Sequence, residues 1–160
     1  QSFGLKKTTM IQRKQSLYLI VAQVVQMLFA TGDYFTYTIS DSLYTVTGSG
    51  TFNSAGEKTG GDMKTLLLGL GISFLALVSI FVYKNRKQQM KLCRIGALLT
   101  LAEIVFIVIS YVNTKEIAQS EPNFGYVIFI LPISTLCFLL AAKAIKKDED
   151  LVKSVDRIRW

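Results

Sequence analysis

Four long apolar stretches alternate with polar segments along the chain. They lie at about 11–30, 63–83, 92–112 and 125–145. A helix needs about 20 mostly apolar residues to cross the hydrocarbon core of a bilayer, which is about 30 Å thick. A helix of a soluble protein keeps a polar face, whereas the stretch from Leu66 to Tyr83 offers only serines before its terminal tyrosine. The pattern therefore predicts an all-α membrane protein, a four-helix transmembrane bundle.

The first of these stretches is the weakest, because its opening turns carry Gln12, Arg13, Lys14 and Gln15. Long cationic side chains can extend to the headgroups, so a span that begins in the interface is still reasonable. A cleaved signal peptide is the alternative, since small residues follow the apolar part at 30–32. We expect a true span.

The segment between the first two spans, residues 31–62, is rich in Tyr, Thr, Val and Ile and partly alternates. That composition is typical of strands. We expect a small β-hairpin in which Tyr34–Ile39 pairs with Leu43–Thr47, with a further strand near 51–53, and a flexible return over residues 54–62. The hairpin would either cap the helices or offer an open strand edge to a partner.

The segment after the fourth span, residues 146–160, continues at helical spacing. Its apolar positions form a stripe that also includes the last residues of the span: Ile145, Leu151, Val152, Val155 and Ile158. We expect an amphipathic cytoplasmic helix, with the acidic run at 148–150 on its solvated face. Such a helix could lie on the inner leaflet, pack on the loop at 84–94, or dock on another protein.

The cations are distributed unequally between the two ends of the predicted spans. All but three of the 18 lysines and arginines flank the first span, the loop between the second and third spans, and the fourth span. Loops on the cytoplasmic side of membrane proteins collect such residues, so both termini are expected in the cytoplasm. From these lysines and arginines we define an inner-face basic cluster: Arg13, Lys84, Arg86, Lys87, Lys91, Arg94, Lys146, Lys147 and Arg157.

The composition agrees with this topology and narrows the chemistry. Hydrophobic residues make up 51% of the chain and charged residues 18%, whereas a soluble domain carries about a quarter charged residues. The net charge of +7 is explained by contact with anionic lipid headgroups. No nucleic-acid partner is expected, because the basic segment at 84–94 lacks the interleaved aromatics of a base-stacking surface.

The absence of histidine excludes His-containing zinc sites, haem held by two imidazoles, and Ser–His or Cys–His catalytic pairs. The sequence also has no phosphate-binding glycine loop and no CxxC, HExxH or G-x-S-x-G motif. We therefore expect no catalytic residues, no cofactor and no metal site.

Glu103 is the one carboxylate in the middle of a predicted span. A charge at that depth is costly and usually faces the interior or an aqueous path. The first span offers Gln23 and Gln26 at a similar depth, so we predict a hydrogen bond from one of these glutamines to Glu103. This intramembrane polar cluster would either hold helices together, as such bonds do for about 0.6–2 kcal/mol, or relay a proton or cation.

Several segments resemble an uncharacterised family of small four-helix inner-membrane proteins from Bacteroidota. The matching segments are residues 10–19 (MIQRKQSLYL), 83–94 (YKNRKQQMKLCR), 131–132 (LP), 142–149 (AKAIKKDE) and 151–159 (LVKSVDRIR). The family opens M-I-Q-R-x-Q, so residues 1–9 are treated as an N-terminal extension and 10–160 as a single membrane domain. Lys14 departs from the family, which more often has an apolar residue there.

The resemblance implies a domain of unknown function in a multi-pass inner-membrane protein, with no assigned activity. Its recurring motifs fall on the cytoplasmic face, which suggests that the start of the first helix, the basic loop and the last helix pack as one unit. The favoured function is a non-enzymatic scaffold or accessory subunit that contacts anionic lipid headgroups and other inner-membrane proteins. The alternative is a small proton- or cation-coupled transporter or channel that uses Glu103; an intramembrane lipid enzyme ranks lowest.

Overall fold

Four helices and a small sheet make up the described part of the chain. The computed structural model describes the backbone of residues 3–61 and 63–158 and the side chains of residues 14–61 and 63–155. The elements follow in the order α1 (Phe3–Thr31), β1 (Asp33–Ile39), β2 (Ser42–Thr47), β3 (Gly50–Asn53), β4 (Lys58–Gly60), α2 (Lys64–Phe81), the short 3-10 turn η1 (Val82–Lys84), α3 (Arg86–Ile117), β5 (Asn123–Phe124) and α4 (Tyr126–Ile158).

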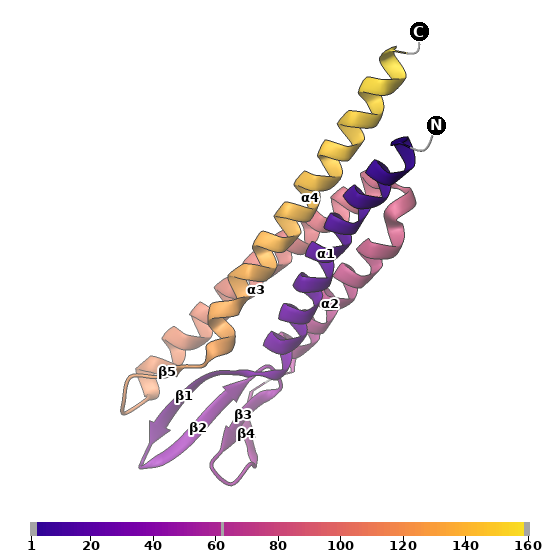
Figure 1. The fold of residues 1–160 in the computed structure, drawn as a ribbon. Helices are drawn as coiled ribbons and strands as arrows, with labels where there is room; N and C mark the ends of the chain where they lie inside the picture. Colours follow the sequence, from indigo (N-terminus) through magenta and orange to yellow (C-terminus); the bar gives the residue numbers. More distant parts are fainter. Residues whose placement is uncertain (1–2, 62, 159–160) are drawn as a thin grey trace.

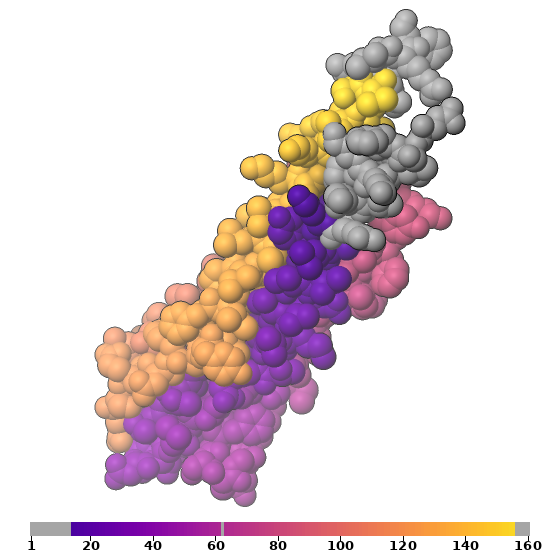
Figure 2. All heavy atoms as spheres, in the orientation of Figure 1, coloured from indigo at the N-terminus to yellow at the C-terminus, as the bar shows by residue number. Residues whose placement is uncertain are grey.

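The helices lie side by side along one long axis, and the sheet covers one end of them (Figure 1). Helix α1 begins and helix α4 ends at the opposite end. Helices α1 and α3 each pack against both α2 and α4. In the space-filling view, the side chains of α1 lie beside those of α4 (Figure 2).

Three helical segments are long and apolar enough to cross a membrane: Lys64–Lys84, Arg86–Ile117 and Tyr126–Val155. Within the described residues, α1 is not among them. Helix α1 begins at Phe3, within the predicted N-terminal extension, and continues through the predicted first span. The predicted cytoplasmic helix at 146–160 is not separate from the fourth span, because α4 continues unbroken from Tyr126 to Ile158.

The outward faces of the helices are apolar. Large side chains such as Leu67, Phe74, Leu98, Phe106 and Phe129 are more than half exposed. Contiguous exposed apolar surface on this scale is unfavourable in water and is expected where a protein contacts lipid. Long apolar helices with apolar outward faces are typical of a membrane protein.

The predicted hairpin is present, and its pairing is as expected. Strand β1 runs antiparallel to β2 with Tyr37 opposite Tyr44 and Ile39 opposite Ser42. Ser40 and Asp41 form the turn with positive φ angles of 49° and 62°, the backbone that a two-residue hairpin loop needs to match the twist of its strands. The predicted third strand near 51–53 is β3, which pairs with β2.

The fold is mostly helical, as expected, but its β-structure is larger than the predicted hairpin: the sheet has five strands in the order β4-β3-β2-β1-β5. The return at 54–62 contains β4, which pairs with β3 through Thr51–Gly60 and Phe52–Lys58. The Asn53 side-chain oxygen accepts hydrogen bonds from the backbone N–H groups of Ala55 and Glu57 and so closes the turn before β4. A three-residue strand without apolar alternation leaves no signal in the sequence.

Strand β5 joins the other side of the sheet from the loop between α3 and α4. It pairs with β1 through Phe35–Phe124, and the Phe124 ring stacks on Tyr111 of α3 with ring centroids 4.6 Å apart. Gly125 follows directly, and a Cβ atom there would lie 2.0 Å from the backbone oxygen of Asp33. Glycine is therefore needed for the sheet to approach the start of α4.

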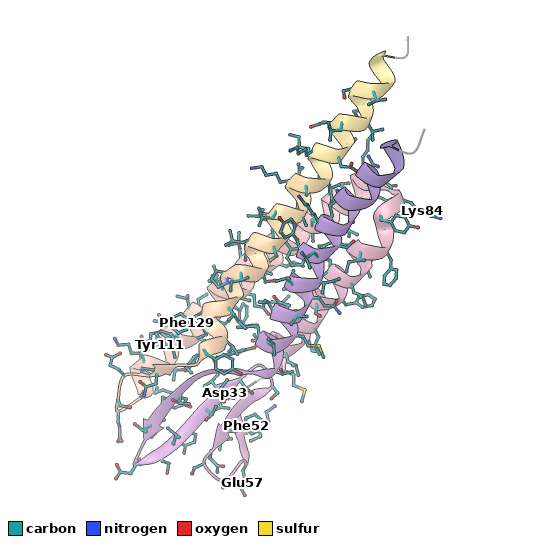
Figure 3. All side chains as sticks on the ribbon, viewed as in Figure 1. Asp33, Phe52, Glu57, Lys84, Tyr111 and Phe129 are labelled. Carbon is teal, nitrogen blue, oxygen red and sulfur yellow. The ribbon has the colours of Figure 1, made fainter. Side chains whose placement is uncertain are left out.

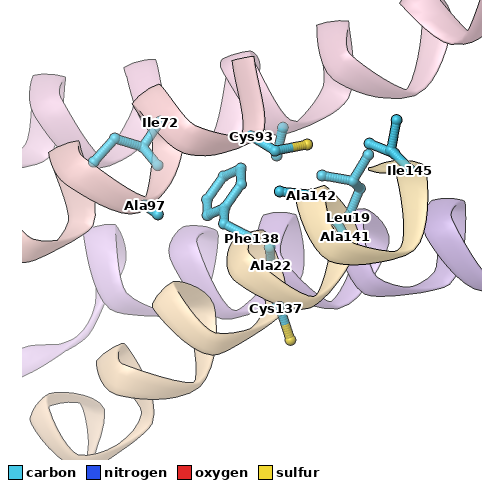
Figure 4. Packing of buried hydrophobic residues seen from close by; sticks show 11 residues of the cluster. Leu19, Ala22, Ile72, Cys93, Ala97, Cys137, Phe138, Ala141, Ala142 and Ile145 are labelled. Atoms are coloured by element: carbon cyan, nitrogen blue, oxygen red, sulfur yellow. The ribbon is translucent and has the colours of Figure 1, made fainter. Parts of the chain in front are cut away.

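Two apolar clusters fill the interior. One lies between the helices towards the ends of the chain and centres on Phe138, with Leu19, Ile72, Cys93 and Ala97 around it (Figure 4). The other joins the sheet to the helices through Phe29, Phe35, Ile107, Val127 and Leu131. At Gly96, a Cβ atom would lie 2.5 Å from the Phe138 ring, so this glycine lets α3 and α4 approach around the aromatic side chain.

Candidate functional site

The intramembrane polar cluster forms where the two apolar clusters meet. Glu103 on α3 and Gln26 on α1 are both fully buried. The amide Nε2 of Gln26 donates a hydrogen bond to Glu103 Oε2. Of the two predicted partners, Gln26 therefore makes this bond, while Gln23 is half-buried on α1.

A third helix closes around this pair. At Gly69 of α2, a Cβ atom would lie 3.1 Å from Glu103 Oε1 and 3.0 Å from Ala30 Cβ. A larger residue there would press against both α1 and α3. The small residue thus allows close helix approach, as is common in membrane helices, and encloses the carboxylate.

Tyr34, at the start of β1, belongs to the same region, although sequence analysis did not select it. The ring of Tyr34 stacks on Phe29 with centroids 4.6 Å apart, and the residue is 3% exposed. Burial raises the pKa of Tyr34 above its ordinary value, and the Glu103 carboxylate adds to the shift. Tyr34 lies in a run of strand-forming residues, and the sequence pattern therefore predicts a strand position for it rather than a contact with an acid inside the membrane.

Polar atoms of this cluster are buried without hydrogen-bond partners among the described side chains: Gln26 Oε1, Tyr34 Oη and Glu103 Oε1. Tyr34 also lines a cavity of about 220 Å³ between the sheet, the start of α2 and the C-terminal half of α3, with Lys64, Ile107 and Ser110 among its other lining residues. Buried polar atoms usually have a partner. Each unpaired oxygen can form a hydrogen bond to water, and the Glu103 carboxyl group can hold a proton.

On the other side of Glu103, polar contacts continue for one helical turn. Thr135 Oγ1 on α4 donates to Thr100 Oγ1 on α3 at 2.9 Å, and Thr100 Oγ1 donates to the backbone oxygen of Ala97. Beyond them lies the apolar cluster around Phe138. The polar interior therefore reaches from the sheet to about the middle of the helices.

The second candidate site lies at the end of the helices opposite the sheet. In Figure 3, Lys84 lies at this end, whereas Asp33 and Glu57 lie at the sheet end. The predicted basic residues of α3 and α4 gather here. The side chains of Arg13 and Arg157, which belong to the predicted cluster, lie outside the described residues.

Arg86, at the start of α3, forms an ion pair with an acidic residue of α4. Its Nη1 lies 3.1 Å from Asp148 Oδ2 on α4 and donates to the Asp148 backbone oxygen at 3.3 Å. Asp148 is 5% exposed, so the expectation of a solvated acidic face was wrong at this residue. The pair joins the basic loop to the last helix, two parts of the predicted inner-face unit.

Other predicted basic residues line a groove of about 520 Å³ between the start of α3 and the C-terminal part of α4. Its lining residues are Lys87, Gln88, Met90, Lys91, Arg94, Lys146, Glu149, Asp150 and Lys153. A neighbouring hollow includes Lys84 and Arg86, and Lys147 is exposed on α4. A groove lined by several cations can bind an anion.

The described side chains show no group of three or more His, Cys, Asp or Glu residues that could hold a metal ion. Cys93 and Cys137 are both buried as free thiols. The described side chains therefore offer one buried carboxyl group, paired with an amide, and a basic groove.

Comparison with known proteins agrees with the resemblance noted from the motifs. No curated protein matches the chain. A family model described as a domain of unknown function matches residues 11–158, which include all four helical stretches predicted from the sequence. The chain therefore belongs to this family, the domain of unknown function DUF4293.

Proposed function

We propose that this chain is a multi-pass protein of a bacterial inner membrane, with α1 as a fourth span and both termini in the cytoplasm. We propose further that it is a non-enzymatic scaffold or accessory subunit of a membrane protein complex. The observation that carries this proposal is the apolar surface at the C-terminal end of α4, which no described part of the chain covers.

The topology is supported by the outer face of α1 and by the charge distribution. Leu17, Val24, Met27 and Leu28 are about half exposed or more on α1, an apolar face of the kind that lipid would cover. The cations of α3 and α4 lie at the end opposite the sheet. Under the positive-inside rule that end is cytoplasmic, so the sheet lies outside.

The end of α4 is placed to meet another protein. In Figure 1, the last turns of α4 extend past α2 and past the start of α3. The helix continues along the axis of its apolar part, and at about 1.5 Å per residue the part after Ile145 reaches about 20 Å further. This direction supports a helix that leaves the membrane rather than one that lies on its surface.

The predicted apolar stripe of α4 is buried at one end and exposed at the other. Ile145 is buried in the helix core, whereas Leu151 is 48% and Val155 is 64% exposed. The side chain of Ile158 lies outside the described residues. An exposed apolar strip at helical spacing suits docking against the groove or helix of a partner protein.

The test is site-specific photo-crosslinking of the full chain in cell membranes. A photoreactive residue at Val155 should form a discrete adduct with a different protein that also co-purifies in fixed stoichiometry. The same residue at Asp150, on the other side of α4, is the matched control and should not. The adduct should disappear with Leu151→Ser. Equal labelling at both positions, or labelling of lipid alone, would contradict the proposal.

A second candidate is a small proton- or cation-coupled transporter or channel. It is favoured by the unpaired buried atoms at Gln26, Tyr34 and Glu103 and by the cavity beside Tyr34. It ranks second because the Phe138 cluster fills the interior beyond Thr100. Reconstituted liposomes would decide: flux that is abolished by Glu103→Gln supports transport, and liposomes as tight as protein-free controls exclude it.

A further inference from the structure

Cations and carboxylates lie in different parts of the basic groove between α3 and α4. Arg86 lies level with Asp148, because the two side chains form an ion pair. Helix α3 runs from there into its apolar part, while α4 arrives from its own apolar part. Arg94, Lys91 and Lys146 therefore line the half of the groove nearer the membrane, and Lys87 lies close to the level of Arg86. Glu149, Asp150 and Lys153 line the half farther away.

The nearer half carries the excess of positive charge. In the farther half, Lys153 pairs with Glu149 at 2.8 Å and Asp150 adds a second carboxylate. Among the described side chains, no carboxylate forms an ion pair with Lys91 or Lys146. The net positive part of the groove thus begins where the apolar surface of the helices ends.

Arg94 is oriented towards this boundary. Its Nη2 donates to the sulfur of Met90 at 3.7 Å, and Met90 lies one turn back towards the start of α3. The guanidinium is therefore directed away from the apolar part of the helix. That is the orientation of a cationic side chain that reaches the headgroup layer from a membrane-embedded position.

On the membrane side of these cations, the same faces of α3 and α4 are apolar. Leu98, four residues after Arg94, is 66% exposed, and Leu139, seven residues before Lys146, is 49% exposed. Residues at these spacings share a helix face. The groove thus continues from a cluster of cations into an apolar surface, which matches a molecule with an anionic head and a hydrocarbon tail.

We propose that this groove binds an anionic glycerophospholipid, whose phosphate contacts Lys91, Arg94 and Lys146 and whose acyl chain lies against Leu98 and Leu139. Basic pockets between membrane helices on the cytoplasmic side suit such headgroups. A zwitterionic lipid fits less well, because its own ammonium group neutralises the phosphate. Free phosphate would leave the apolar continuation without a ligand.

This lipid site is independent of the docking proposed for Leu151 and Val155. At 100° per residue, Lys146 and Lys153 lie on the side of α4 opposite those two residues. Failure of one proposal therefore leaves the other intact.

The experiment is native mass spectrometry of the full chain in mild detergent, titrated with phosphatidylglycerol or with phosphatidylcholine. The test variant is K91Q/R94Q/K146Q, and the control K14Q/K84Q/K147Q removes the same charge from the same end of the helices. Each of the three cations adds to the attraction of a negatively charged lipid headgroup. We therefore expect the test variant to bind phosphatidylglycerol about 10- to 100-fold more weakly, and the control to bind nearly as the unmodified chain does.

Equal weakening in both variants would overturn the proposal, as would equal binding of phosphatidylcholine and phosphatidylglycerol. Displacement of the lipid by an excess of inorganic phosphate would identify free phosphate as the ligand and would also overturn it. If the triple variant does not fold, Lys91→Gln is compared with Lys14→Gln, at an exposed lysine of α1. A selective loss of phosphatidylglycerol in Lys91→Gln supports the site, and no difference between the two contradicts it.

Discussion

Gln26 of α1 donates a hydrogen bond to Glu103 of α3 across the diagonal of the four helices. Each of these two helices packs chiefly against α2 and α4, so the bond joins elements that share little other contact. Gly69 of α2 lies against the same carboxylate. A single polar pair thus connects three helices at the depth where the sheet and the helix core meet.

Glu103→Ala should destabilise the fold, whereas Glu103→Gln should have little effect. Alanine leaves the buried Gln26 amide without an acceptor, at a cost of about 1–3 kcal/mol, while glutamine keeps the shape and an acceptor oxygen. Chemical unfolding in detergent, followed by circular dichroism, measures both. A large loss of stability in Glu103→Gln would show that the carboxylic acid itself is required.

Gly96→Ala should destabilise the packing of α3 on α4. The added methyl group would meet three atoms of the buried Phe138 ring at 2.5–2.8 Å, and overpacking of this kind costs about 1–3 kcal/mol. The control is Gly71→Ala on α2, where a Cβ atom would have no neighbour within 4 Å, so it should be neutral or stabilising. The measurement is the unfolding midpoint in detergent.

A double-mutant cycle extends this test, because Phe138→Leu makes room for the methyl group. The double variant G96A/F138L should lose less stability than the sum of the two single variants. Strict additivity would mean that Gly96 is not needed for the approach of the Phe138 ring.

Arg86→Met should destabilise the end of the helices opposite the sheet. It leaves Asp148, which is 5% exposed, without its ion-pair partner, and an unpaired buried polar group costs about 1–3 kcal/mol. Lys87→Met, the neighbouring exposed cation, is the control. Hydrogen exchange of α3 and α4 should increase near Asp148 in the first variant only, and unchanged exchange would contradict a structural role for the pair.

The stability of the protein should fall with rising pH partly through Tyr34. Burial, and secondarily the nearby Glu103, raise the pKa of Tyr34 above its ordinary value of 10.0. The folded chain therefore keeps this proton to a higher pH than the unfolded chain. The resulting stabilisation is complete below about pH 10 and is lost as the pH rises above it, towards the folded-state pKa.

Tyr34→Phe removes this contribution, so the stability of that variant should depend less on pH above about 10. The measurement is the free energy of unfolding as a function of pH for both chains. Tyr44, in the same sheet but half-buried, supplies the control variant Tyr44→Phe. Identical slopes for Tyr34→Phe and the unmodified chain would contradict the prediction.

The sequence by itself determined the long apolar helices, because length and apolar composition follow directly from the residues. It also determined the β1–β2 hairpin, since turn residues lie between two runs of strand formers. The isolation of Glu103 among apolar residues was enough to identify a buried polar contact with the first helix.

Only the tertiary structure decided which faces meet. Helices that are apolar all round do not reveal which side is buried, so the choice of Gln26 over Gln23 and the contact of Gly96 with Phe138 depend on helix rotation. The sequence predicted Asp148 to be one of three solvated acids. In the folded chain it is buried, with Arg86 Nη1 lying 3.1 Å from its carboxylate. Strands β4 and β5 are held by backbone pairing and by the contacts of Asn53 and Phe124, and a segment of two or three residues carries no periodicity from which such pairing could be predicted.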